Sequence, residues 1–338
     1  MWKWIRANAG VPGRSTRFRV MPAVVMAGLL VAAAAGAQPV IPLNPALGEL
    51  PEGVAIDKPG NIWITVQTLC EVRRYTPAGE ELMRVQLVAA DRCIAANGLA
   101  VDATGNAYVA VGTKDEATHG VYIVEPTGAF SHIDGTGQIE SPNALAWDHQ
   151  NGTLYVTDMT GGAVWRIDRN GVELWLQDPA LQGTLPPPAP IFPPDLRLGA
   201  NGIAFRQSAV YVAVTWLPRL VRIPVDRDGS AGTPEVVVSP PAFFAMGVFA
   251  LDGLALDVFG NFFAAAPSGS VVRISADGTD ISKIAGPAEG VSASPLSLAF
   301  GTGKGDRQYL FVTINPSFGG VGSGVVRVFA GAPGQPIP

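Results

Sequence analysis

A short phrase recurs six times along the chain, and the same position in five of the six copies carries a polar side chain. The copies read PEGVAID, ANGLAVD, PNALAWD, ANGIAF, LDGLALD and PLSLAF, and begin at residues 51, 96, 142, 200, 251 and 295. A period near 45 residues with strand-like content is typical of a β-propeller. The repeated position, called the slot below, holds Glu52, Asn97, Asn143, Asn201, Asp252 and Leu296. In a propeller, these six positions would gather around one axis.

The first five repeats each predict four strands and the sixth predicts three, and together they predict one all-β domain over residues 38–338. The expected fold is a six-bladed β-propeller of four-stranded antiparallel blades. Recurring Asp–Gly turns, at Asp57, Asp102 and Asp257, are ordinary hairpin chemistry. Blade six lacks room for a fourth strand before Pro338, so we expect residues 40–43, the start of the mature chain, to pair with its exposed edge and close the ring.

Residues 1–37 have the pattern of a secretory signal peptide. Five basic residues and no acidic one precede an apolar stretch at 21–35, and Ala-Gly-Ala at 35–37 is a small-residue cleavage pattern. A membrane anchor is the alternative, although a span needs about 18 unbroken apolar residues. We therefore expect an exported protein, periplasmic or extracellular, with no membrane attachment after cleavage.

Charge and cysteine content narrow the class further. Without residues 1–37 the chain has 18 basic and 28 acidic residues, a net charge of −10. Such an acidic domain lacks the basic footprint of a nucleic-acid binder. In an oxidising compartment Cys70 and Cys93 are expected to form a disulfide, because the topology places both in loops on one face; two buried free thiols are the alternative.

Two insertions lengthen the spacing between repeats. Successive slots lie 45, 46, 58, 51 and 44 residues apart, and the surplus falls in a Pro-rich stretch, 177–199, and an apolar stretch, 240–250. Both precede an innermost strand, so both should overhang the face that holds the slots. They are expected to be binding loops or lids, or decoration without a role. The apolar residues Phe243 to Phe249 suggest a substrate that is more apolar than a sugar acid.

The slot side chains have the chemistry of a hard-cation site. Carboxylate, amide carbonyl and water oxygens are the ligands that Ca²⁺ prefers, whereas Zn²⁺ usually requires His or Cys. Without a cation, the proximity of Glu52 and Asp252 would raise a carboxyl pKa. The alternative is that these residues only begin strands and bind backbone groups or waters. We expect one divalent cation, Ca²⁺, with Mn²⁺, Mg²⁺ and Zn²⁺ as alternatives.

The slot motifs resemble those of the gluconolactonase, regucalcin and senescence-marker-protein family of six-bladed propellers. Paraoxonases and strictosidine-synthase-like proteins are similar more distantly. The resemblance covers about residues 50–328 and depends on the motifs PEG, PN, ANGI and LDGL at 51, 142, 200 and 251. It implies that Glu52, Asn201 and Asp252 bind a divalent metal. It also implies that Asn143 contacts substrate or metal-bound water, and that Asp252 is the general base.

Two departures from the family pattern matter. The sugar lactonases place an Arg two residues before the blade-three Asn, where this chain has Ser141, which puts sugar-lactone recognition in doubt. Paraoxonases carry a catalytic His in the blade-two slot, where this chain has Asn97. Asn97 is expected to contact substrate, with an added metal ligand or a plain strand-start residue as the alternatives. His119 and Asp158 lie in loops of the same face, the first as a surface residue and the second as a candidate substrate contact.

Three functions remain open from the sequence. The leading hypothesis is a secreted metal-dependent hydrolase of a small-molecule lactone or ester. The second is a non-catalytic propeller that binds a ligand or partner around a structural cation. A lyase or condensing activity is the third, and no residue of its own supports it. Fold alone does not choose among them, because propellers host many functions.

Overall fold

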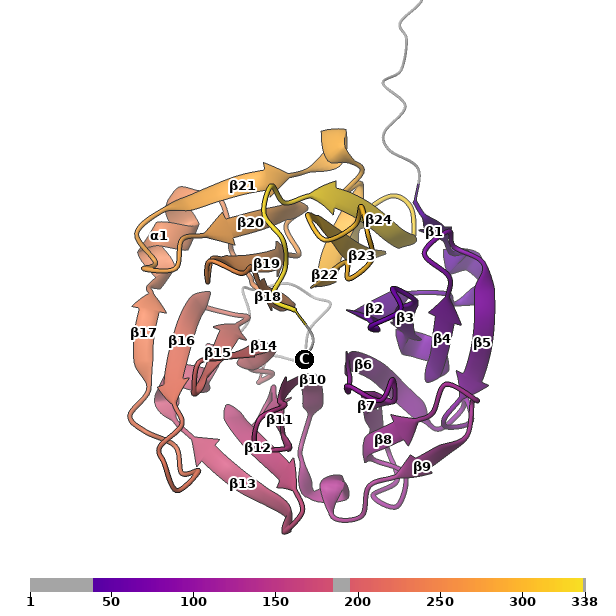
Figure 1. Cartoon of the computed structure of the whole chain (residues 1–338), viewed down its shortest axis with the longest axis horizontal. Coiled ribbons are helices and arrows are strands. Elements are labelled where there is room, and N and C mark those ends of the chain that lie inside the picture. The colour runs from indigo at the N-terminus through magenta and orange to yellow at the C-terminus, as the bar shows by residue number, and fades with distance from the viewer. Residues whose placement is uncertain (1–38, 185–194, 337–338) are drawn as a thin grey trace, which may run out of the picture. The chain divides into compact units, whose positions relative to one another are not determined.

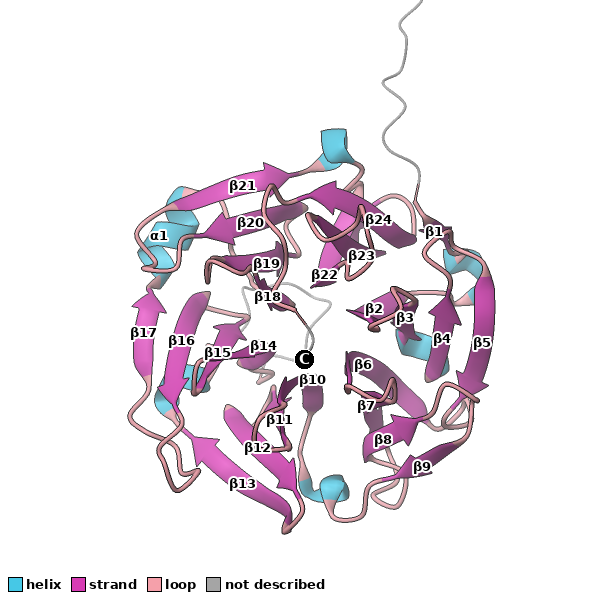
Figure 2. Ribbon diagram, viewed as in Figure 1, coloured by secondary structure: helices cyan, strands magenta, loops and turns pink. Residues whose placement is uncertain are grey.

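The computed structural model of the chain describes residues 39–184 and 195–336. The predicted signal peptide and residues 185–194 of the Pro-rich insertion lie outside the described residues. Six antiparallel four-stranded sheets are arranged in a ring, as predicted, and all six lie in one unit, Ala35–Pro338. Figure 1 shows the innermost strand of each sheet next to the axis, and Figure 2 shows how little helix accompanies the strands.

The blades follow one another in chain order, each built from its innermost strand outward. Blades one to three are β2 (Pro51–Ile56), β3 (Ile62–Val66), β4 (Glu71–Tyr75), β5 (Glu81–Gln86); β6 (Cys93–Val101), β7 (Ala107–Thr113), β8 (Gly120–Val124), β9 (Phe130–His132); and β10 (Pro142–Asp148), β11 (Thr153–Asp158), β12 (Ala163–Asp168), β13 (Gly171–Gln177). Blades four and five are β14 (Ala200–Arg206), β15 (Ala209–Val214), β16 (Arg219–Pro224), β17 (Glu235–Val238); and β18 (Leu254–Leu256), β19 (Phe262–Ala266), β20 (Ser270–Ile274), β21 (Ile281–Ala285). Blade six is β22 (Ala293–Phe300), β23 (Tyr309–Gly320), β24 (Gly324–Phe329) and β1 (Ile41–Pro42).

The helical segments are short and all lie between strands. They are α1 (Pro240–Ala245) and the 3₁₀ turns η1 (Pro45–Leu47), η2 (Gln67–Leu69), η3 (Thr136–Gln138), η4 (Pro179–Leu181) and η5 (Pro287–Glu289). Within the described residues, no helix is long and apolar enough to cross a membrane.

The core lies between neighbouring blades, which explains the strand composition. Every residue of β3 is buried, because each sheet packs on both faces and β-branched and aromatic side chains suit that environment. Trp63 of blade one, for example, shares a cluster with Val109 and Val111 of blade two. The turn aspartates are structural, as predicted. The Asp57 carboxylate accepts a hydrogen bond from the Asn61 N–H at 2.7 Å and forms an ion pair with Arg74 at 2.7 Å.

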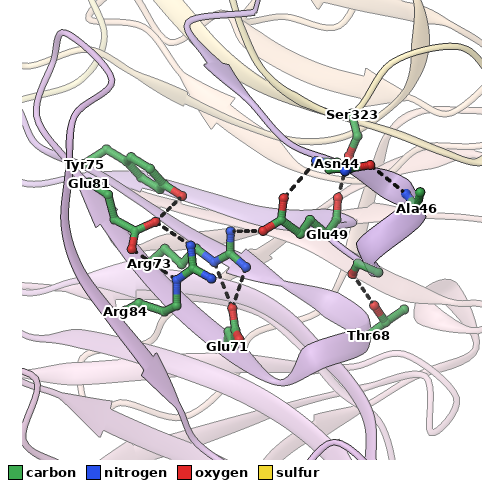
Figure 3. A network of polar contacts seen from close by, with 11 residues as sticks. Asn44, Ala46, Glu49, Thr68, Glu71, Arg73, Tyr75, Glu81, Arg84 and Ser323 are labelled. Carbon is green, nitrogen blue, oxygen red and sulfur yellow. Dashed lines mark hydrogen bonds and ion pairs between the residues drawn. The ribbon is translucent and has the colours of Figure 1, made fainter.

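The N-terminal segment closes the ring, as predicted. In β1, Ile41 pairs with Val325 of β24, and Ile41 is fully buried. A polar network ties residues 44–49, which follow β1, to blade one (Figure 3). The Glu49 carboxylate forms an ion pair with the buried Arg73 at 2.8 Å and accepts a hydrogen bond from the Asn44 N–H at 2.9 Å. Ser323 of blade six donates to the Glu49 carbonyl at 2.7 Å. The first and last blades are therefore joined by backbone pairing and by charge.

Irregularities in the innermost strands lie at the slots. The pairing register shifts between Pro51 and Val54, and at the equivalent points of blades two, three, four and six. Such β-bulges re-aim side chains and increase local twist. Each of these bulges contains the slot residue and the residue after it, so the irregularity orients the slot side chain.

The predicted disulfide is present. The Cys70 and Cys93 sulfurs are bonded, with Cα atoms 5.7 Å apart. The bridge links the end of η2 in blade one to the start of β6 in blade two.

Candidate functional site

All six slot residues meet at one cavity on the propeller axis. The cavity has a volume of about 270 Å³ and is lined by Glu52, Asn97, Asn143, Asn201, Asp252 and Leu296, together with Gln67, Met159, Leu198, Thr215, Trp216, Ala250, Pro267 and Phe318. Slot residues up to 244 positions apart in sequence, Glu52 and Leu296, are thus brought together. The convergence required for a shared site is present, and the individual roles of these residues stay predictions.

Three oxygen atoms in this cavity are buried without a hydrogen-bond partner among the described residues. They are Glu52 Oε2, Asn143 Oδ1 and Asn201 Oδ1. Buried polar atoms in native proteins nearly always have a partner, so each exception requires an explanation. Three unpartnered oxygens that line one cavity match the ligands of a cation.

The neighbours of the two asparagines leave the amide oxygens free. Asn201 Nδ2 donates to Thr215 Oγ1 at 3.0 Å, and Asn143 Nδ2 lies 3.5 Å from Met159 Sδ. Met159 Sδ also lies 3.8 Å from Asn201 Nδ2. Because their amide nitrogens have partners, the oxygens of both side chains remain available to a ligand.

Asn97 is held differently from the other two asparagines. Its Nδ2 donates to the Pro142 carbonyl at 2.9 Å, which ties blade two to the strand that carries Asn143. Asn97 lines the cavity and is buried. This position favours a substrate contact or a strand-start role over a cation ligand.

The pKa values of the two buried carboxyl groups in the cavity are both raised. Burial raises the pKa of Glu52 well above its usual range, and the nearby charge of Asp252 raises it further. Burial also raises the pKa of Asp252 well above its usual range, while hydrogen bonds from Asn201 and the Gly253 N–H oppose the shift. A divalent cation would remove both penalties, because it compensates the lost hydration and the repulsion.

The donor set fits a hard cation. Among residues 39–184 and 195–336, no three His, Cys, Asp or Glu side chains are grouped so that they could hold a metal ion. The cavity offers two carboxylates and amide oxygens instead, which suits Ca²⁺, Mg²⁺ or Mn²⁺ better than Zn²⁺. Glu52, Asn201 and Asp252 are the residues that would hold it, with the Asn143 oxygen nearby.

The rest of the cavity lining is largely apolar, and its origin differs from the sequence-based expectation. Phe243 of the apolar insertion is fully buried in the core cluster of blades four and five. Phe244 and Phe249 stack on each other 5.9 Å apart and do not line the cavity. The two insertions contribute Leu198 and Ala250 at their ends.

Loops between the second and third strands of the blades supply the other apolar lining residues. Met159, Trp216 and Pro267 lie in these loops of blades three to five, and Phe318 lies near the end of β23 in blade six. Sequence reasoning missed them because these loops differ between blades and carry no repeated phrase. Phe318 lies in the hairpin of β23 and β24, which the Gly-rich sequence at 319–324 predicts without placing Phe318 at the cavity.

Two other candidates do not line the cavity. The Asp158 carboxylate accepts the backbone N–H groups of Glu140, Ser141 and Gly161, each at 3.0 Å. It therefore fixes the loop before Asn143, and its role as a substrate contact stays a prediction. The His119 ring accepts the Thr113 N–H at 3.1 Å and contacts the Ile139 carbonyl at 2.7 Å, which makes it a loop brace.

Fold and site together define a six-bladed propeller with an oxygen-lined axial cavity. A family model described as "SMP-30/Gluconolactonase/LRE-like region" matches residues 90–178 and 195–315, more than half of the chain. The chain belongs to this family, which confirms the resemblance inferred from the slot motifs. No curated protein sequence matches the chain.

Solved structures with the same fold include members of this family. A luciferin-regenerating enzyme aligns with a TM-score of 0.63 at 16% identity, covering 88% of this chain and 98% of its own. Regucalcin, a calcium-binding protein from Agrobacterium tumefaciens, aligns at 0.62 and 19% identity, covering 89% and 95%. A gluconolactonase from Xanthomonas campestris aligns at 0.60 and 16% identity, covering 90% and 93%. At these identities the likeness establishes the fold alone.

Proposed function

We propose that this protein is an exported, divalent-metal-dependent hydrolase of a lactone or ester. The observation that carries the proposal is the set of three unpartnered buried oxygens beside Asp252 in one cavity. Membership of a family that includes a gluconolactonase and a calcium-binding regucalcin supports both the activity and Ca²⁺ as the cation. The basic and apolar pattern of residues 1–37 supports export to the periplasm or beyond.

The chemistry divides between the cation and the residues around it. A divalent cation supplies Lewis-acid polarisation of the scissile carbonyl and acidification of water. The water oxygen attacks the acyl carbon while Asp252 accepts the water proton. Asp252 then returns that proton to the leaving alkoxide as the C–O bond breaks. Asn143 and Asn97 orient the substrate from the neighbouring blades.

We further propose a substrate with an apolar portion. Phe318, Trp216 and Leu198 face the same cavity as the oxygens, and Ser141 stands where the sugar lactonases have an Arg. Phe318→Ala should reduce kcat/KM for aryl esters or alkyl lactones about 10-fold, the effect of about 1.4 kcal/mol of lost apolar contact. Val321→Ala is the control, because Val321 is 74% exposed on the same hairpin and does not line the cavity. Equal losses in both variants would contradict the assignment.

The activity itself is tested on chelator-treated protein. Aryl esters and lactones of increasing apolar character are offered with Ca²⁺, Mn²⁺, Mg²⁺ or Zn²⁺, and Asp252→Asn serves as the inactive control. We expect turnover that requires added cation and that the variant lacks. A cation that raises Tm with no turnover on any substrate would instead support the non-catalytic propeller with a structural cation.

A further inference from the structure

We infer that Thr313 is a positioning residue: its hydroxyl completes a hydrogen-bonded chain across blade six that sets the spacing between the Asp252 and Glu52 strands. The inference rests on the proposed cation site, since it assigns Thr313 a role in holding two of that site's ligands. Thr313 is fully buried in β23 and does not line the cavity.

The chain of hydrogen bonds has three links. The Gly253 N–H, which follows Asp252, donates to the Leu296 carbonyl at 2.7 Å. The Leu296 carbonyl and the Ser297 N–H belong to one peptide group, and this N–H donates to Thr313 Oγ1 at 2.9 Å. Thr313 Oγ1 then donates to the Glu52 carbonyl at 2.6 Å. An unbroken hydrogen-bonded path therefore joins the backbones of the two carboxylate residues.

The peptide group between Glu52 and Gly53 is held at both of its polar atoms. Thr313 binds its carbonyl, and Thr65 Oγ1 accepts its N–H at 2.7 Å. Thr65 donates in turn to the Asn97 carbonyl at 2.6 Å. Because the peptide plane is fixed from two blades, the backbone that carries the Glu52 side chain has little freedom to rotate.

The threonines occupy one equivalent position in the second strand of their blades, opposite the bulge. Thr157 makes the same pair of bonds in blade three, from the Ala144 N–H at 2.9 Å and to the Asn201 carbonyl at 2.7 Å. By register, blades two, four and five carry alanines at this position, namely Ala110, Ala213 and Ala265. A hydroxyl is thus present only in blades one, three and six, and in two of these it holds a proposed cation ligand of the next blade.

Blade six is where such a link is most needed. Its slot holds Leu296, so no side-chain ligand lies between Asp252 and Glu52 on this side of the ring. Thr313 and Glu52 are also 261 residues apart, so their contact exists only once the ring has closed. The hydroxyl therefore transmits ring closure to the geometry of the cation site.

The test compares two buried threonines that make the same kind of bonds. Thr313→Val keeps the shape and removes the hydroxyl, and we expect the dissociation constant for Ca²⁺ to rise about 10–100-fold, as is usual when a group that orients a metal ligand is lost. Thr313→Ser keeps the hydroxyl and should bind Ca²⁺ as the wild type does. Thr136→Val is the control: Thr136 is fully buried, accepts the Val121 N–H at 2.9 Å and donates to the Ile133 carbonyl at 2.7 Å, away from the cavity. It should lose stability with no change in the dissociation constant.

Calorimetric titration with Ca²⁺ alone, alongside Tm, separates the outcomes. Wild-type protein that binds no divalent cation overturns the proposed function and this inference with it. Wild-type binding that Thr313→Val retains, or that Thr136→Val loses to the same degree, overturns this inference only. If Thr313→Val does not fold, Thr65→Val takes its place, because it releases the other end of the same peptide group; unchanged affinity there counts equally against the assignment.

Discussion

At the level of single residues, burial of two carboxyl groups lowers the free energy of unfolding of the cation-free protein. Glu52 and Asp252 are each at least nine-tenths buried, and neither forms an ion pair with a described cationic side chain. Burial of an ionised carboxyl group without a compensating charge is unfavourable, so the pKa of such a group rises and its neutral form is favoured. A site built this way is stable at neutral pH when a cation binds, so stability and cation occupancy should be coupled.

Glu52→Gln should separate the two effects. The pKa of each carboxyl is raised in the folded protein, so the free energy of unfolding of the cation-free protein falls as pH rises from the acid range through the raised values. Removing one charge should therefore raise the Tm of cation-free protein at pH 7, on the order of 2 °C. The same change should abolish the Tm increase that Ca²⁺ gives to the wild type. A variant that still gains Tm with Ca²⁺ would contradict the role of Glu52.

The slot residues could be predicted from the sequence because repetition marks them. Six copies of one phrase identify equivalent positions, and a propeller brings equivalent positions together. Met159 and Thr215 could not be found in this way. They directly follow the second strands of blades three and four, where the residue type changes from blade to blade, and their contribution depends on where the Asn143 and Asn201 nitrogens point.

At the level of elements, bulges lie at the slots in the innermost strands of blades one to four and six, and Asp252 of blade five lies just before β18. A regular strand would alternate its side chains between two faces, whereas the bulge aims the slot side chain at the axis. The residue after the slot must also admit a neighbouring backbone. A Cβ on Gly202 would lie 2.2 Å from the Asp252 carbonyl oxygen, and one on Gly53 would lie 2.8 Å from that of Asn97.

Gly202→Ala should therefore damage both fold and site. The added methyl would push β14 away from the Asp252 backbone, at a cost of about 1–3 kcal/mol in the free energy of unfolding, and cation affinity should fall. Gly112→Ala is a matched control in β7, since its Cβ would meet its nearest neighbour at 3.7 Å. Denaturant unfolding and Ca²⁺ titration measure both. A Gly202→Ala protein as stable as the control would contradict the close-packing explanation.

The strands themselves followed from alternation, turn chemistry and β-branched composition, whereas the bulges did not. The glycine after the slot was visible in four repeats, at 53, 98, 202 and 253. Its meaning depends on the neighbouring blade, which a single repeat does not reveal. The apolar insertion shows the same limit: Phe243 fills the core between blades, and local sequence does not distinguish a buried loop residue from a cavity wall.

For the whole molecule, ring closure is the decisive event. The last blade is completed by the first strand of the described chain, and Val40 and Leu43 bond to Val325 and Ser323 on either side of the pairing. Closure removes the exposed edge of β24. It also brings Thr313 to Glu52, so that the cation site is complete only in the closed ring.

A chain that begins at residue 44 should show the effect of losing this strand. Burial of Ile41 alone contributes about 2 kcal/mol, and the freed edge of β24 would promote association between molecules. We expect a lower Tm, weaker Ca²⁺ binding and concentration-dependent aggregation by light scattering. A chain that begins at residue 38 is the control and should match the full-length protein. Identical behaviour of the two would show that closure does not depend on β1.

Six blades, their order and the closing strand could all be predicted, because the period, the count of repeats and the missing fourth strand of blade six are properties of the sequence. The oxygen-bearing side chains of the cavity could be predicted from the sequence, whereas most residues of its apolar wall could not. That wall is assembled from three loops and the end of β23, which belong to four different blades and share no repeated phrase.

Calcium titration of chelator-treated wild-type protein and of Asp252→Asn, followed by calorimetry, tests the central claim most directly. We predict one Ca²⁺ per chain in the wild type, and at least a 10-fold weaker site in the variant, because a hard cation loses one of two carboxylate ligands. Equal binding by both proteins, or no binding by the wild type, would contradict the assignment of the axial cavity as a cation site.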